Sequence, residues 1–157
     1  MVLLYKYDLQ NNLNNQKKLD DLQQLVNSDL KNVNIIIKDK IKNKINHIPK
    51  VAGHLVKAGG KRIRPMLCLA CAQLCDYKGV KHLNLAASIE FIHTATLLHD
   101  DVIDESKKRR GLRTANNIWG NKSSVLVRDF LLSKSFELMT EVKNIEVLQI
   151  LSETSSR

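Results

Sequence analysis

The sequence is poor in aromatic residues and in cysteine, and each shortage excludes a class of structure. Aromatic residues make up 4% of the 157 residues. The core must therefore come from Leu, Ile, Val and Ala, which favours packed helices over sheets. Cys68, Cys71 and Cys75 provide no disulfide framework, which indicates a reducing compartment. Their spacing also fits a metal site, but small buried side chains on a core-facing helix are the favoured interpretation.

Long apolar segments are also absent. No run is long enough to cross a bilayer, and the apolar stretch before Lys6 is too short for a signal peptide. We therefore expect a soluble, cytoplasmic protein. The net charge of +9 predicts an anionic partner, but charge alone does not choose among nucleic acid, a membrane surface and a phosphorylated metabolite.

Apolar residues recur at three- and four-residue intervals along most of the chain, which is typical of amphipathic helices. Residues 1–18 are polar and are expected to form a loose leader, and residues 19–157 to form one all-α unit. Helices are expected over residues 19–30, 33–48, 54–58, 65–77, 81–104 and 123–140, and again after Asn144. Pro49 is expected to end the second helix, and residues 105–121 to form a loop without strands.

Three carboxylates stand near the end of one expected helix, in the sequence Leu97-Leu98-His99-Asp100-Asp101-Val102-Ile103-Asp104. Asp100 and Asp104 are four residues apart and so share a face of the helix, where like charges destabilise it unless a cation neutralises them. Mg²⁺ suits this place because it takes carboxylate oxygens together with phosphate oxygens. A solvated acidic helix end is the alternative.

A basic loop follows, with the sequence Lys107-Lys108-Arg109-Arg110-Gly111. Arginine and lysine side chains bind phosphate oxygens. An acidic cluster followed by a basic loop predicts a diphosphate site.

Two further segments turn this pattern into a family resemblance. Gly59-Gly60-Lys61-Arg62-Ile63-Arg64-Pro65 lies upstream, and Ile89 to Asp101 joins it to the acidic motif. From about Leu19 onward the chain resembles the N-terminal half of the trans-isoprenyl diphosphate synthases (polyprenyl synthetases), particularly the long-chain group. The resemblance implies an isoprenoid-synthase-type helical bundle. It also implies a prenyltransferase that uses Mg²⁺ to condense isopentenyl diphosphate head-to-tail onto an allylic diphosphate.

The resemblance also assigns roles to individual residues. Asp100 and Asp104 correspond to the metal ligands, with Asp101 in support. Arg109 corresponds to the residue that binds the allylic diphosphate. The residues that correspond to the isopentenyl diphosphate site are Lys61, Arg64, His93 and Arg110. Arg113 stands where the family commonly has proline, which predicts a less rigid loop.

Ala95 and Thr96 occupy the positions that limit product length in the family. Bulky aromatic side chains there give short products, so these two small residues imply a long-chain product. An alanine selected only for helix packing is the alternative for Ala95.

The resemblance stops near Arg157, before a second aspartate-rich motif, so we expect a truncated or split form. Such a chain would act as a homo-oligomer or with a separate C-terminal-half chain, and would touch the membrane when it handles lipid product. One alternative is an inactive remnant or a regulatory subunit. A basic nucleic-acid-binding protein ranks last, because no aromatic platform accompanies the charge, and no nucleic-acid partner is expected.

Overall fold

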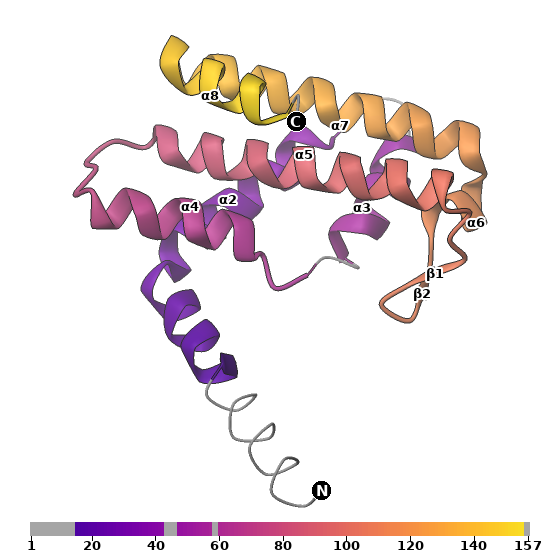
Figure 1. The fold of residues 1–157 in the computed structure, drawn as a ribbon, viewed down its shortest axis with the longest axis horizontal. Coiled ribbons are helices and arrows are strands. Elements are labelled where there is room, and N and C mark those ends of the chain that lie inside the picture. Colours follow the sequence, from indigo (N-terminus) through magenta and orange to yellow (C-terminus); the bar gives the residue numbers. More distant parts are fainter. Residues whose placement is uncertain (1–14, 43–46, 58–59, 156–157) are drawn as a thin grey trace, which may run out of the picture.

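The computed structural model describes residues 15–42, 47–57 and 60–155, and most of them are helical. Two long helices, α5 (Lys81–Ile103) and α7 (Asn121–Glu141), lie side by side along the molecule (Figure 1). The shorter helices α2 (Asn27–Lys40) and α4 (Ile63–Leu74) pack on α5. The remaining helices are α3 (His47–Lys57), α6 (Ala115–Trp119) and α8 (Ile145–Ser155).

The core forms around α5, which is covered on several sides. Its alanines and one large aromatic residue, Phe91, are buried among leucines and valines of α2 and α7. Ala86, Ala87 and Ala95 have almost no exposed surface, and such small side chains let neighbouring helices approach closely. This packing holds α5 in place, and α5 carries most of the predicted site.

Several helix boundaries differ from the predictions. Residues 15–18, placed in the leader, are helical and belong to a helix over residues 15–25, while residues 1–14 lie outside the described part. Helix α2 runs through the break expected near residue 31. Pro49 does not end a helix. It lies in the first turn of α3, where its missing N–H costs nothing.

The expected loop contains a small hairpin and a short helix. Strands β1 (Lys108–Arg109) and β2 (Leu112–Arg113) pair antiparallel, and α6 follows at once. Arg110 and Gly111 both have positive φ, which is the geometry of a tight two-residue hairpin turn. The prediction that this segment lacks strands was wrong, because two-residue strands are too short to show alternation.

The cysteines are less buried than expected. Cys68 is half-buried and packs against the core, whereas Cys71 and Cys75 are exposed. Large apolar side chains are exposed as well on α4, α7 and α8. Within the described residues, no helix has both the length and the apolar character needed to cross a bilayer.

Candidate diphosphate site

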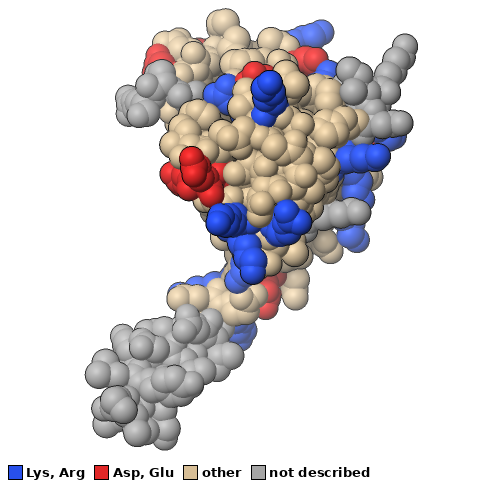
Figure 2. Space-filling view, turned by 90° about the vertical axis from the view of Figure 1, so that its right-hand side faces the viewer, with Lys and Arg blue, Asp and Glu red and all other residues tan. Residues whose placement is uncertain are grey.

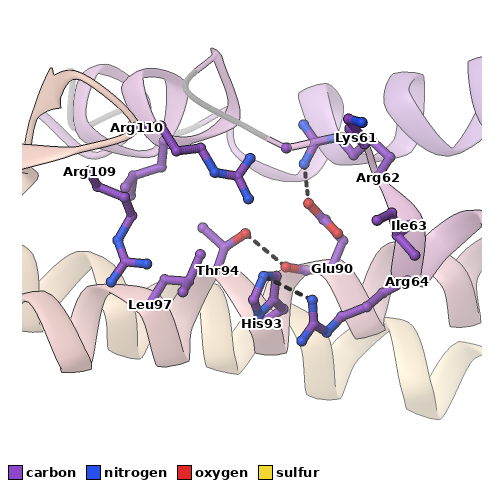
Figure 3. A pocket seen from close by; sticks show the side chains of 12 residues that line it. Lys61, Arg62, Ile63, Arg64, Glu90, His93, Thr94, Leu97, Arg109 and Arg110 are labelled. Atoms are coloured by element: carbon purple, nitrogen blue, oxygen red, sulfur yellow. Dashed lines mark hydrogen bonds and ion pairs between the residues drawn. The ribbon is translucent and has the colours of Figure 1, made fainter. Parts of the chain in front are cut away.

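A cavity of about 90 Å³ lies between α5, the N-terminal end of α4 and the β-hairpin (Figure 3). Its lining includes every residue for which a substrate-binding role was predicted: Lys61, Arg64, His93, Arg109 and Arg110. These residues come from three segments of the chain that are separated by more than a dozen residues. The fold thus gathers the predicted residues around a single small space.

The turn before α4 sets the positions of Lys61 and Arg64. Arg62 between them adopts a left-handed conformation with φ of 53°, and Arg64 lies in the first helical turn. Pro65 in the same turn restricts the backbone to helical φ and has no N–H to leave unpaired. Lys61 donates a hydrogen bond to Oε1 of Gln16 at 2.7 Å.

The hairpin turn places Arg110 over the cavity, opposite the side chains of α4 (Figure 3). Its guanidinium lies against Gly60. A Cβ atom at that position would overlap the guanidinium and force it aside. Gly111, with φ of 81°, completes the turn in a conformation that favours glycine. Glycines of both predicted motifs are therefore needed for the position of Arg110.

Two carboxylates neutralise part of this positive charge. Glu90, buried on α5, forms an ion pair with Arg62. Oδ1 of Asp101 accepts a hydrogen bond from Nε of Arg109 at 2.9 Å, and Nη2 of Arg109 lies 2.9 Å from the same oxygen in an ion pair. Within the described residues, Lys61, Arg64 and Arg110 have no carboxylate partner. Three cations around one small space attract a multiply charged anion.

His93 lies at the centre of the cationic side. Its Nε2 is 3.2 Å from Nη1 of Arg64. Burial lowers the pKa of His93, and the neighbouring guanidinium of Arg64 lowers it further, against a smaller opposing effect of Glu90. A neutral imidazole accepts a hydrogen bond from Arg64, whereas the protonated ring would be repelled.

This environment makes a pH-dependent prediction. Because the unfolded chain protonates His93 at a higher pH than the folded chain does, stability should fall as pH drops below about 6.5. Arg64→Ala should raise the pKa of His93 by removing the neighbouring charge. NMR titration of the His93 ring, assigned with His93→Gln, measures both pKa values. An unchanged pKa in Arg64→Ala would contradict the proposed contact.

The acidic motif faces outward from the end of α5. Asp100 and Asp104 are exposed one turn apart, and the Asp104 amide donates to the Asp100 carbonyl at 2.8 Å. Asp101 is buried, and its Oδ2 has no hydrogen-bond partner among the residues that the structure describes. No three His, Cys, Asp or Glu side chains converge as a metal site in the described part. Two free carboxylates nevertheless fit Mg²⁺, which takes its other ligands from water and phosphate.

Ala95 and Thr96 line a second cavity, of about 560 Å³, between α5, α7 and α8. Its walls are mainly apolar and include Leu132, Phe136 and Leu151. A third space, a groove of about 800 Å³, runs along α4 and α5 to the start of α8. Arg64 lines both this groove and the cationic cavity.

The groove also explains the environment of the cysteines, all three of which line it. Burial raises the pKa of the Cys68 thiol to about 11, with a smaller contribution from Cys71. Cys68 therefore stays protonated and behaves as an apolar wall residue.

The sequence analysis assigned no role to Arg62 or Glu90. Both line the cavity, and their ion pair joins the turn before α4 to α5. A role for Glu90 could have been inferred from the sequence. It is a carboxylate in an apolar helix, three residues before His93, and therefore lies on the same helix face as His93. Arg62 gave no such signal, since it pairs across 28 residues of sequence.

Comparison with known proteins relates this geometry to one family. The polyprenyl synthetase family model matches residues 45–157, which is well over half of the chain. The octaprenyl diphosphate synthase of Escherichia coli is 44% identical over 135 residues, which are 86% of this chain and 42% of that protein. The chain belongs to the polyprenyl synthetase family, long-chain type.

Solved structures of long-chain polyprenyl synthases agree with this assignment. A decaprenyl diphosphate synthase from Rhodobacter capsulatus superposes with a TM-score of 0.85 and 52% identity, over 88% of this chain and 43% of that one. A polyprenyl synthase from Caulobacter crescentus, complexed with calcium and isoprenyl diphosphate, gives 0.86 and 46%, over 88% and 42%. These matches confirm the predicted isoprenoid-synthase-type helical fold. The chain spans about two fifths of the length of these three relatives.

Proposed function

We propose that this chain supplies the isopentenyl diphosphate site and the first acidic metal site of a long-chain polyprenyl diphosphate synthase. The observation that carries the proposal is the convergence of Lys61, Arg64 and Arg110, with no carboxylate partner, on one cavity beside His93. This arrangement suits the diphosphate group of a small substrate. The reaction would be the head-to-tail condensation of isopentenyl diphosphate with an allylic diphosphate.

In this proposal the two substrates bind at opposite ends of the C-terminal half of α5. Lys61, Arg64 and Arg110 bind the diphosphate of isopentenyl diphosphate, and His93 donates or accepts a hydrogen bond according to its protonation. His93 is seven residues from Asp100, or about 10 Å along the helix, so two diphosphates fit without overlap.

The allylic diphosphate would lie near the acidic motif, with Arg109 on its inner side. Asp100 and Asp104 would hold Mg²⁺, which supplies positive charge to the diphosphate that leaves the allylic substrate. Asp101 fixes Arg109 through their ion pair and so acts as a positioning residue. The calcium in the Caulobacter crescentus structure supports a divalent cation in this family.

The remainder of the site would come from polypeptide outside the matched region of these relatives. The relatives extend well beyond the matched region, and the part that they add would face the exposed apolar side chains of α4, α7 and α8. A continuation of the same polypeptide, a second copy of this chain or a separate C-terminal-half chain would provide it. Some relatives carry the name heptaprenyl diphosphate synthase component 2, which supports assembly from separate chains.

Incorporation of isopentenyl diphosphate into lipid by the purified chain, with Mg²⁺ and an allylic primer, tests the proposal directly. Turnover would support it and would show that copies of the chain assemble an active site. Without turnover, saturable binding of isopentenyl diphosphate that Arg64→Ala removes would support a binding half-site. Absence of both turnover and binding would contradict the proposal.

Product length should depend on the cavity beside Ala95 and Thr96. Ala95 is 2% exposed, so Ala95→Phe should cost about 1–3 kcal/mol through overpacking as well as fill the cavity. Thr96 is exposed and lines the same cavity, so Thr96→Phe should fill it at a smaller cost. In an active enzyme that contains this segment together with the remaining half of the family fold, both variants should give shorter products by chromatography.

A matched variant in the groove separates the two possible paths of the growing chain. Ala72 lines the groove along α4 and α5 but not the cavity beside Ala95. If Ala72→Phe shortens the product while Thr96→Phe leaves it unchanged, the prenyl tail follows the groove, and the role expected for Ala95 and Thr96 is wrong.

A further inference from the structure

The outer face of the β-hairpin carries positive charge that the diphosphate cavity does not use. Residues 107–113 include five cations and no acid. Arg109 and Arg110 line the cavity, whereas Lys107, Lys108 and Arg113 are exposed and do not line it. The Arg113 guanidinium donates to the carbonyl and to the side-chain oxygen of Asn117, which are both neutral groups. Across the described residues, neither Lys107 nor Lys108 has an ion-pair partner.

Exposed apolar side chains surround these cations. Leu112, in the register position opposite Arg109, is 48% exposed. Ile118 is 39% exposed on α6, and the hydrogen bond from Asn117 Nδ2 to the Lys107 carbonyl holds α6 against the hairpin. Figure 2 shows this end of the molecule, where groups of basic side chains and a separate acidic group border a broad uncharged surface. The hairpin end therefore combines cations with apolar surface.

We propose that this outer face docks on an anionic membrane surface. Lys107, Lys108 and Arg113 would reach the lipid head groups, and Leu112 would enter the boundary between head groups and acyl chains. The proposal depends on the charge and the exposure of these hairpin residues. It does not depend on the proposed prenyl-transfer function.

The geometry favours a membrane over the other anionic partners. A small diphosphate is bound by cations that converge on a cavity. Lys107, Lys108 and Arg113 instead lie outside the diphosphate cavity, on the exposed hairpin segment. Single-stranded nucleic acid is commonly bound by aromatic stacking, and the hairpin has no aromatic residue. Trp119 nearby packs edge-on against His54, with ring centroids 5.2 Å apart.

Co-sedimentation of the full chain with lipid vesicles tests the proposal. Vesicles of phosphatidylcholine with about one third phosphatidylglycerol should bind the chain, pure phosphatidylcholine should not, and salt should weaken the binding. Each cation near an anionic surface strengthens binding roughly five-fold, so Lys107→Ala/Lys108→Ala should reduce partitioning roughly 25-fold. Leu112→Ser should also reduce it. Circular dichroism checks that each variant is folded.

Lys17→Ala/Lys18→Ala is the matched control, because it removes the same charge from an exposed pair on the helix over residues 15–25. It should leave partitioning within two-fold of the parent chain, taking the ordinary effect of distant surface charge. Equal losses in the two double variants would overturn the proposal, since net charge alone would then explain binding. Displacement from vesicles by inorganic diphosphate, or tighter binding of a DNA duplex with the same loss in Lys107→Ala/Lys108→Ala, would overturn it as well.

Discussion

Replacing Asp100 or Asp104 with alanine should abolish the magnesium-dependent binding of a diphosphate by this chain. Both side chains are exposed, project from one end of α5 and have no cation partner in the described part of the protein. A bound cation contributes several kcal/mol to holding phosphate charge, so each substitution should weaken binding in Mg²⁺ by roughly 100-fold or more. The fold should be unaffected, because neither carboxylate is buried or paired.

Calorimetric titration of the chain with inorganic diphosphate, with Mg²⁺ and then with a chelator, measures the effect. Asp129→Ala is the matched control, because it removes an exposed carboxylate of α7 that pairs with Arg128 and lies outside the acidic motif. In the chelator, the parent chain and all three variants should bind equally weakly through the basic cavity. A magnesium dependence that persists in both Asp100→Ala and Asp104→Ala would place the cation elsewhere.

The sequence predicted the long helices and most of the cationic site, for two separate reasons. Helices such as α5 show apolar periodicity over many residues, which makes their existence clear even where their ends are not. Lys61, Arg64, His93, Arg109 and Arg110 lie in motifs that resemble a family, and the structure brings all five to one cavity. Their roles in binding remain predictions.

Other features could not be read from the sequence, because long-range contacts decide them. Arg62 and Glu90 form their ion pair only because the turn before α4 lies against α5. Asp101 was grouped with Asp100 and Asp104 by sequence, yet it is buried, whereas those two are exposed. Successive residues on a helix are about 100° apart, so adjacent aspartates must face different surroundings.

Breaking the ion pair between Asp101 and Arg109 should have the largest effect on stability. The side chain of Asp101 is 1% exposed and that of Arg109 is 37% exposed. Removing one member of a buried pair typically costs 3–5 kcal/mol, and the partial exposure of Arg109 lowers this expectation to about 2–3 kcal/mol for Asp101→Asn. Asparagine keeps the size of the side chain, so the loss measures charge rather than a cavity.

Urea denaturation of Asp101→Asn, Arg109→Gln and the double variant measures the coupling between the two residues. The double variant should lose less stability than the sum of the single losses, because neither single partner is then left unpaired. Asp129→Asn, in the exposed pair with Arg128, should cost less than about 1 kcal/mol. If Asp101→Asn lowers the free energy of unfolding by no more than this control does, the ion pair with Asp101 does not hold Arg109 in position. The position of Arg109 beside the cavity would then have to come from the hairpin alone.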